Sequence, residues 1–264
     1  MTDLATLIVR RLPPLCEVTL NRPQRLNAIN EDMARELSAV LVDCEQDEEI
    51  QVVVLTGSQK AFSAGFDMSA FANDGLPFTN YRARYNARAH RTVLQLLANY
   101  TKPLISAVEG YCLGGGLELA LFTDLIVASE TAQFGFPEVS HGMTPGAGAT
   151  QTLPRLIGTA RALELMWTGR RFGATLAKEY GLINHIVAAA TALDEAHRLA
   201  GEIASNAPLA LMMIKQAVRR GIDTPLMHGV ALESDLNYLL NFSEDMKEGI
   251  AAFAEKRKPK FVGR

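Results

Sequence analysis

The stretch PLISAVEGYCLGGGLELALFTDLIVAS, residues 103–129, places three consecutive glycines and a glutamate inside a long apolar run. Residues 104–111 and 124–129 predict strands buried on both faces, because each is almost continuously apolar. Residues 116–124 predict a short helix that begins at or just after the glycines. Two buried strands joined through a helix favour an α/β architecture with crossover connections.

The sequence before this stretch continues the alternation of strands and helices. Residues 6–9 and 16–20 predict strands on either side of a turn at Pro13 and Pro14. Residues 51–57, QVVVLTG, are β-branched and apolar up to the glycine, which is typical of another strand buried on both faces.

Helical patterns precede this stretch once and dominate the last third of the chain. Residues 29–44 predict a helix that Asn30 caps, with its apolar side chains on one face. Pro208 is a typical first residue of one of the C-terminal helices. We therefore expect an α/β core over residues 1–190 and a helical C-terminal region over residues 191–264.

The composition is that of an ordinary globular protein, with 264 residues, 48% of them hydrophobic and 21% charged. A net charge of −3 gives no general attraction to nucleic acid or to an anionic membrane. Three widely spaced cysteines form no disulfide framework, which favours a reducing compartment. We find no secretory signal and no uncharged apolar segment long enough to span a membrane, so we expect a cytoplasmic protein.

Several common motifs are absent. The sequence has no GxxxxGK[ST] phosphate loop and no GxGxxG dinucleotide fingerprint. Ser63 lacks the first glycine of a nucleophile elbow, because Ala61 occupies that position. The histidines have no spacing that suits a metal ion, so we expect no metal site.

Two glycine-containing loops and two glutamates remain as candidates for a site. The first backbone N–H groups of a helix have no internal partner, and glycine lets a ligand reach them, so the glycines before Glu118 could bind an oxyanion. Gly65, in a loop expected to follow the strand at residues 51–57, could supply a second such loop. Pro137 would direct Glu138 toward the same place, and two carboxylates facing one water can divide general-base and general-acid roles. The alternative for the first loop is close packing of helix on strand, with Glu118 as a cap or in a salt bridge.

Four segments together resemble the crotonase superfamily, specifically the enoyl-CoA hydratases. They are NRPQRLNAI, AFSAGFDMSAF, GYCLGGGLELALFTD and FGFPEVSHGMTPGAGATQTLPRLIG, and the resemblance extends over essentially the whole chain. The resemblance implies an α/β fold built as a spiral of ββα units, with C-terminal helices that form a homotrimer, and often a hexamer of two trimers. It also implies an acyl-CoA thioester as substrate, with coenzyme A as part of that substrate and no other cofactor.

The resemblance assigns roles to four residues. The backbone N–H groups of Phe66 and Gly115 would hold the thioester oxygen, while Glu118 accepts a proton from the attacking water and Glu138 delivers one to C2. The implied reaction is the addition of water to a trans-2-enoyl-CoA, giving a 3-hydroxyacyl-CoA. Further positions match coenzyme A contacts: Arg25, Leu26, Ala28, Ala64, Asp67, Met68 and Leu113, together with Phe253 and Lys256, which in relatives reach the coenzyme A bound by a neighbouring subunit.

The sequence departs from the family pattern mainly at Phe66, which fills a position usually held by a small residue. Its ring would narrow the pocket or reposition the acyl chain. The segment at residues 69–97 corresponds to the region that shapes the acyl pocket in the family, and its aromatic residues belong either to the core or to that pocket: Phe71, Phe78, Tyr81 and Tyr85. The alternatives to a hydratase are another crotonase enzyme, such as a double-bond isomerase or a pathway-specific hydratase or lyase, and a non-catalytic scaffold.

Overall fold

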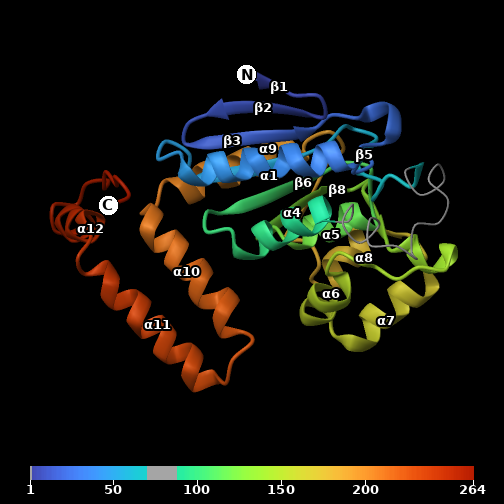
Figure 1. Ribbon diagram of the computed structural model, residues 1–264. Coiled ribbons are helices and arrows are strands. Elements are labelled where there is room, and N and C mark those ends of the chain that lie inside the picture. The colour runs from blue at the N-terminus through green and yellow to red at the C-terminus, as the bar shows by residue number, and fades with distance from the viewer. Residues whose placement is uncertain (1, 70–87) are drawn as a thin grey trace.

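The computed structural model describes residues 2–69 and 88–264 (Figure 1). The aromatic residues predicted to shape the acyl pocket or the core, Phe71, Phe78, Tyr81 and Tyr85, lie outside the described residues. Within them the chain forms two β-sheets, with helices packed around them and further helices at the C-terminal end (Figure 1). The predicted α/β class is therefore confirmed.

The larger sheet has the strand order β1-β2-β3-β4-β6-β8-β11 among the described residues. Its first three strands are antiparallel, and the pairs from β3 through β11 are parallel. The strands are β1 (Thr2–Asp3), β2 (Leu7–Leu12), β3 (Leu15–Leu20), β4 (Val52–Thr56), β6 (Leu104–Val108), β8 (Leu125–Ser129) and β11 (His185–Val187). The strands β4 and β6 are buried along their whole length, as their unbroken apolar sequence predicts.

The smaller sheet contains β5 (Ala61–Ser63), β7 (Tyr111–Leu113), β9 (Gln133–Gly135) and β10 (Phe172–Gly173). In this sheet β5, β7 and β9 are parallel neighbours, and β10 is antiparallel to β9. In each of the consecutive strand pairs β4–β5, β6–β7 and β8–β9, the first strand belongs to the larger sheet and the second to the smaller sheet. The next described helices after these pairs are α4 (Arg88–Asn99), α5 (Gly115–Leu121) and the 3₁₀ helix η3 (Pro137–His141) with α6 (Ala149–Ile157), which gives the expected spiral of ββα units.

The prediction of one strand over residues 104–111 is wrong. The chain forms β6 in the larger sheet, turns at Gly110 and enters the smaller sheet as β7. Gly110 has a φ of +55°, and a Cβ atom there would lie 2.1 Å from the carbonyl oxygen of Lys60. The second glycine loop likewise follows the short strand β5 and not β4 directly, which the sequence did not indicate.

Helix α1 (Glu31–Gln46) confirms the predicted cap, because the N–H of Met33 donates to Oδ1 of Asn30 at 3.0 Å. Its buried face includes Met33, Leu37 and Leu41, and the helix lies against the sheets beside α4 (Figure 1). The short 3₁₀ helix η1 (Pro23–Arg25) precedes it. Helices α7 (Thr159–Thr168) and α8 (Ala174–Glu179) complete the part of the fold around α6.

The C-terminal helices differ in what they contact. Helix α9 (Ala192–Ala204) packs Ala192, Ala196 and Ala200 against the larger sheet. Helices α10 (Pro208–Gly221), α11 (Leu226–Leu240) and α12 (Glu244–Ala254) extend away from the sheets (Figure 1). The division of the chain at residues 190 and 191 stays a prediction.

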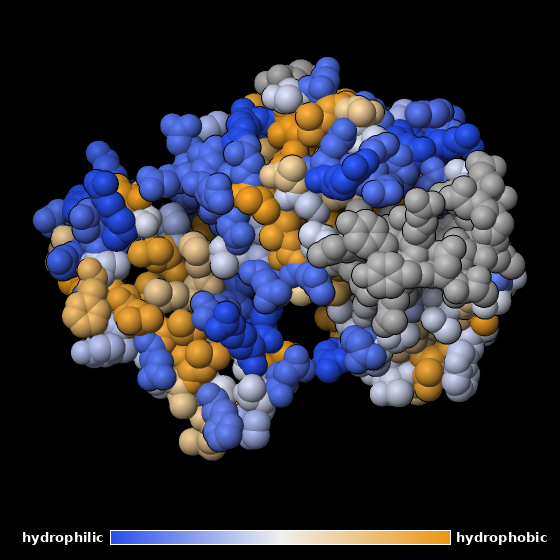
Figure 2. Space-filling view, in the orientation of Figure 1, coloured by the Kyte–Doolittle hydropathy of each residue, from blue (hydrophilic) through white to orange (hydrophobic). Residues whose placement is uncertain are grey.

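Helices α10–α12 expose many apolar side chains, and Figure 2 shows apolar surface gathered over this part of the molecule. A surface of this kind is typical of an interaction site, because a monomer rarely exposes so much contiguous apolar area. The residues are Ile214, Val218, Ile222, Leu226, Met227, Val230, Tyr238, Leu239, Phe242, Met246, Ile250 and Phe253.

Two further predictions can be compared with the described residues. No helix in that part of the chain has the length and apolar character needed to cross a membrane. Within the same ranges, no three His, Cys, Asp or Glu side chains gather where they could hold a metal ion. The three cysteines are buried and form no disulfide.

We predict that Gly110→Ala lowers the free energy of unfolding by at least about 2 kcal/mol, because the methyl group would meet the backbone of Lys60 in a left-handed conformation. The matched control is Gly201→Ala in α9, where a Cβ meets nothing within 4 Å, and we expect it to stabilise by up to about 1 kcal/mol. Urea denaturation measures both. Equal effects of the two substitutions would contradict this account of the turn between the sheets.

Candidate active site

Three loops meet at one edge of the smaller sheet. Residues 64–66, 114–116 and 136–138 directly follow β5, β7 and β9, and these strands are parallel neighbours. The carboxyl ends of parallel strands lie at the same edge of a sheet, which is where ligands gather in α/β folds. The structure therefore brings together the predicted residues Phe66, Gly115, Glu118 and Glu138.

Each of the three consecutive glycines is in close contact with a different residue. A Cβ atom on Gly114 would lie 2.7 Å from Oε1 of Glu138. On Gly115 it would lie 2.6–2.9 Å from three ring atoms of Phe66, and on Gly116 it would lie 2.6 Å from Cβ of Ser63. A side chain at any of these positions would displace a neighbouring residue of the site. The glycines therefore allow close packing, as the alternative interpretation of this loop predicts.

The glycines also begin helix α5. Gly114 has a φ of +48° and precedes the helix, and Gly115 is its first residue. The N–H of Glu118 is the first in the helix to bond back, donating to the carbonyl of Gly114 at 2.9 Å. The helix N-terminus therefore presents its first backbone N–H groups, with their partial positive charge, toward the loops around it.

The peptide group of Phe66 is fixed by hydrogen bonds on both sides. The N–H of Ile29 donates to the carbonyl of Gly65 at 2.8 Å, and the N–H of Asp67 donates to the carbonyl of Ile29 at 2.9 Å. These two hydrogen bonds form a parallel bridge that holds the Phe66 loop against the segment of Ile29. A Cβ atom on Gly65 would lie 3.3 Å from the backbone nitrogen of Gly115, so the loops of Phe66 and Gly115 are in contact.

A network of polar side chains, which includes Arg22, Asn27 and Ser63, holds the Phe66 loop in place. Arg22 pairs with Asp67 at 2.9 Å and donates to the carbonyl of Ala28 at 2.6 Å. Asn27 is fully buried, and its amide donates to the carbonyl of Ala61 at 2.9 Å. The hydroxyl of Ser63 donates to the carbonyl of Asn27 at 2.8 Å. Neither Arg22 nor Asn27 was predicted to take part in the site, although both lie in the segment NRPQRLNAI.

Glu118 is completely buried and is held by backbone donors. Its Oε1 accepts hydrogen bonds from the N–H of Ala147 at 2.7 Å and of Ala149 at 3.0 Å, in the glycine-rich segment that leads into α6. Its Oε2 is buried and finds no hydrogen-bond partner among residues 2–69 and 88–264. Burial raises the pKa of Glu118 to about 7, the two backbone bonds oppose this, and the charge of Glu138 adds to the increase.

Glu138 lies in η3, which begins at Pro137 as predicted. Its Oε2, like that of Glu118, is buried and accepts no hydrogen bond from the part of the chain that the structure describes. Burial raises the pKa of the Glu138 carboxyl, whereas its own backbone N–H and the nearby His141 lower it. Neither glutamate forms a salt bridge with a described residue, so the salt-bridge alternative for Glu118 finds no support there.

Most of the predicted coenzyme A contacts lie beside these loops. The N–H of Ala64 donates to the carbonyl of Leu26 at 2.9 Å, which joins the segment of Arg25, Leu26 and Ala28 to the Phe66 loop. Arg25, Leu26 and Met68 are exposed, and Leu113 is buried. The carboxylate of Asp67 binds Arg22 and also accepts hydrogen bonds from the N–H and hydroxyl of Ser69.

Two predicted contacts lie elsewhere. Phe253 is 87% exposed on α12, and Lys256 is exposed just beyond the end of that helix. In Figure 1, α12 lies at the left edge of the molecule, whereas α5 lies near its centre. One chain therefore does not bring Phe253 and Lys256 to the site.

Comparisons with known proteins agree with the fold and with the predicted resemblance. A family model for enoyl-CoA hydratase/isomerase matches residues 13–264. The chain is 43% identical to the probable enoyl-CoA hydratase of Rhizobium meliloti (strain 1021) over 260 residues, 98% of either protein. It is 40% identical to the 2,3-dehydroadipyl-CoA hydratase of Escherichia coli (strain K12) over 261 residues, 99% of this chain and 100% of that protein. The crystal structure of enoyl-CoA hydratase from Bacillus anthracis is similar with a TM-score of 0.93 and 36% identity, over 98% of this chain and 100% of that one.

We predict that Glu118→Gln stabilises the protein at pH 8 by roughly 3 kcal/mol and has little effect near pH 4.5, since burial shifts the pKa of Glu118 from 4.5 to about 7. A carboxyl whose pKa is raised in the folded state makes that state bind more protons than the unfolded state. The wild type therefore loses stability as the pH rises from about 4.5 to about 7, and the variant does not. Urea denaturation of both proteins from pH 4.5 to pH 8 measures the difference, and a difference independent of pH would contradict the raised pKa.

Proposed function

The chain belongs to the enoyl-CoA hydratase/isomerase family, and on that premise we propose that it is an enoyl-CoA hydratase. The reaction adds water across the 2,3 double bond of a trans-2-enoyl-CoA and gives a 3-hydroxyacyl-CoA. The observation that carries the proposal is the pair of carboxylates of Glu118, which is buried, and Glu138, which is half-buried. Each has one buried oxygen that finds no hydrogen-bond partner among the described residues. A water molecule between these two oxygens would satisfy both, because buried polar atoms need a partner.

The backbone N–H groups of Phe66 and Gly115 hold the thioester oxygen in this proposal. The hydrogen bonds that hold the Phe66 loop and the contact of this loop with Gly115 support this part of the proposal. Hydrogen bonds to the carbonyl oxygen withdraw electrons from C3 and stabilise the negative charge that develops as water adds. A donor of this kind is worth roughly 3 kcal/mol in comparable sites.

The two glutamates then move the protons. Water attacks C3, Glu118 accepts the proton that the water loses, and Glu138 gives a proton to C2, so that one water molecule is added in all. The pKa of about 7 for Glu118 suits this role, because a group titrating near the working pH can both take up and release a proton. Burial also raises the pKa of Glu138, which is the direction of shift that suits a proton donor. The charge of Glu138, when it is ionised, contributes to the raised pKa of Glu118.

Coenzyme A enters only as part of the substrate. We propose that its tail follows the exposed side of Arg25, Leu26 and Ala28, where the guanidinium suits a phosphate. The pantetheine arm would follow the backbone of Ala64, Met68 and Leu113 toward the thioester oxygen. Asp67 would serve this path through its backbone, because its carboxylate binds Arg22 and Ser69.

A cytoplasmic location fits the three free cysteines.

We further propose that the chain assembles as a homotrimer, or as a hexamer of two trimers, through α10–α12. The exposed apolar side chains of these helices support this, as does the position of Phe253 and Lys256 away from their own chain's site. In the assembly, the partner subunit's Phe253 and the partner subunit's Lys256 would contact coenzyme A bound by the first chain.

We predict that the purified protein removes the ultraviolet absorbance of the enoyl thioester when it is mixed with crotonyl-CoA. Glu118→Gln and Glu138→Gln should each lower kcat by about 100-fold or more, because each loses a group that moves a proton. Glu130→Gln, an equally conservative change at an exposed position, should leave the rate unchanged. Full activity in either glutamine variant would contradict the mechanism, and conversion of a 3-enoyl-CoA to the 2-enoyl isomer without hydration would favour an isomerase.

We predict that Ile222→Asp weakens the assembly, because Ile222 is 68% exposed beside the apolar face of α10–α12 and a charge there would oppose burial. The matched control is Leu12→Asp, at an exposed apolar residue of β2 on another part of the fold. Sedimentation velocity should show trimers or hexamers for the wild type and the control, and smaller species for Ile222→Asp. A monomeric wild type would contradict the proposed assembly.

A further inference from the structure

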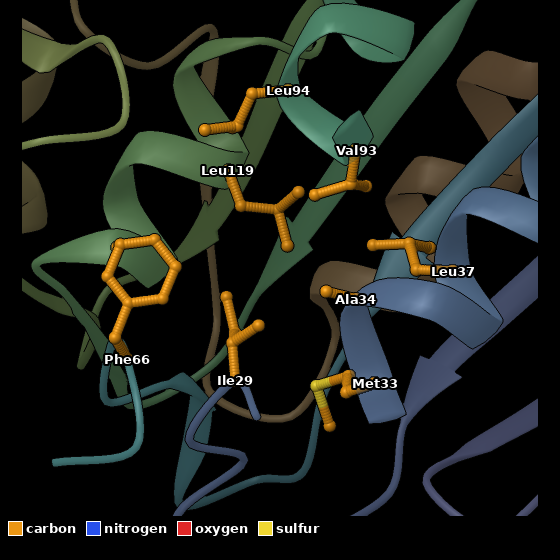
Figure 3. Close-up of a pocket in the computed structure, with 9 residues that line it drawn as sticks. Ile29, Met33, Ala34, Leu37, Phe66, Val93, Leu94 and Leu119 are labelled. Atoms are coloured by element: carbon orange, nitrogen blue, oxygen red, sulfur yellow. The ribbon is translucent and has the colours of Figure 1, made fainter. Parts of the chain in front are cut away.

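A small apolar cavity borders the Phe66 ring and Gly115, two residues of the proposed thioester site (Figure 3). Helix α1 contributes Ala34 and Leu37, helix α4 contributes Val93 and Leu94, and helix α5 contributes Leu119. Figure 3 shows these side chains converging on one space, with Phe66 at its edge. The cavity has room for about one water molecule, and none of the described residues that line it has a charged or polar side chain.

Phe66 and Gly115 belong both to this cavity and to the proposed thioester site. The Phe66 ring packs so closely on Gly115 that a Cβ atom there would overlap it. The ring therefore occupies the space between the residue that would hold the thioester oxygen and the apolar interior behind it. A small residue in place of Phe66 would leave this space continuous with the cavity.

We propose that the side chain of Phe66 restricts the substrate to short acyl chains by closing this cavity. The inference rests on the proposed function, because it concerns the acyl group of the same substrate. Its physical basis is size: an apolar cavity of roughly 150 Å³ accepts a molecule as large as benzene, so removing a phenyl ring makes room for several methylene groups. The surrounding side chains of α1, α4 and α5 would then provide an apolar wall for those methylenes.

The test compares kcat/KM for trans-2-octenoyl-CoA and for crotonyl-CoA in the wild type and in Phe66→Ala. We expect the wild type to favour crotonyl-CoA and the variant to raise the octenoyl-to-crotonyl ratio by at least about tenfold, since each accommodated methylene contributes to discrimination. Phe66→Leu, which keeps more of the apolar packing, should raise the ratio less and serves if the alanine variant does not fold. An equal preference in the wild type, or an unchanged ratio in both variants, would overturn the proposal.

A second substitution shows whether the cavity itself receives the chain. Ala34 lines the cavity from α1, so Ala34→Leu in the Phe66→Ala background should refill the space and return the ratio toward the wild-type value. A ratio that stays high in the double variant would place the longer chain elsewhere and contradict the inference.

Binding separates this inference from the proposed function. Butyryl-CoA and octanoyl-CoA are saturated and cannot be hydrated, so calorimetry can compare their Kd values with each protein whatever reaction the protein catalyses. We expect the preference for butyryl-CoA in the wild type to fall by about tenfold in Phe66→Ala. If crotonyl-CoA is not hydrated but the preference for butyryl-CoA falls in Phe66→Ala, the hydratase proposal is wrong and the size limit holds. If crotonyl-CoA is hydrated but the preference does not change, the size limit is wrong and the hydratase proposal holds.

Discussion

The site depends on three consecutive positions that leave no room for a side chain. Gly114, Gly115 and Gly116 are backed in turn by Glu138, by the Phe66 ring and by Ser63, each within 3 Å of where a Cβ atom would stand. These three partners come from two other turns of the spiral. The close approach of the glycine backbone to these three residues fixes where α5 begins and how its first N–H groups face the surrounding loops. The contacts that pack the fold therefore also define the site.

The buried position of Glu118 follows from this arrangement. A carboxylate is costly to bury, and among the described residues only the N–H groups of Ala147 and Ala149 compensate Glu118, at one of its two oxygens. The rest of the cost appears as a raised pKa, which the nearby Glu138 increases. A group held in this way destabilises the folded protein at neutral pH and is suited to exchanging protons there. Such a cost is typical of functional sites, where stability is given up for reactivity.

Much of the fold could be predicted because burial leaves a pattern in the sequence. The apolar runs of β4 and β6 and the capped, one-sided helix α1 are examples. The break between β6 and β7 could not be found in this way, since the apolar run continues through the turn and only the contact of Gly110 with Lys60 requires it. The site residues came from motifs of a known family. The groups that hold these residues in place could not be predicted in the same way. The donors to Glu118, for example, are the backbone N–H groups of two alanines, and a backbone donor leaves no signal in the type of side chain.

The most direct test of this account is the infrared carbonyl stretch of crotonyl-CoA, labelled with ¹³C at the thioester carbon and bound to Glu118→Gln. In this variant hydration is slow while the backbone around Phe66 and Gly115 is kept. If the two N–H groups hold the thioester oxygen, the stretch of the bound ligand lies at clearly lower frequency than that of the free ligand, because hydrogen bonding polarises the carbonyl. A bound ligand with the frequency of free crotonyl-CoA would contradict the central claim that these loops form the reaction centre.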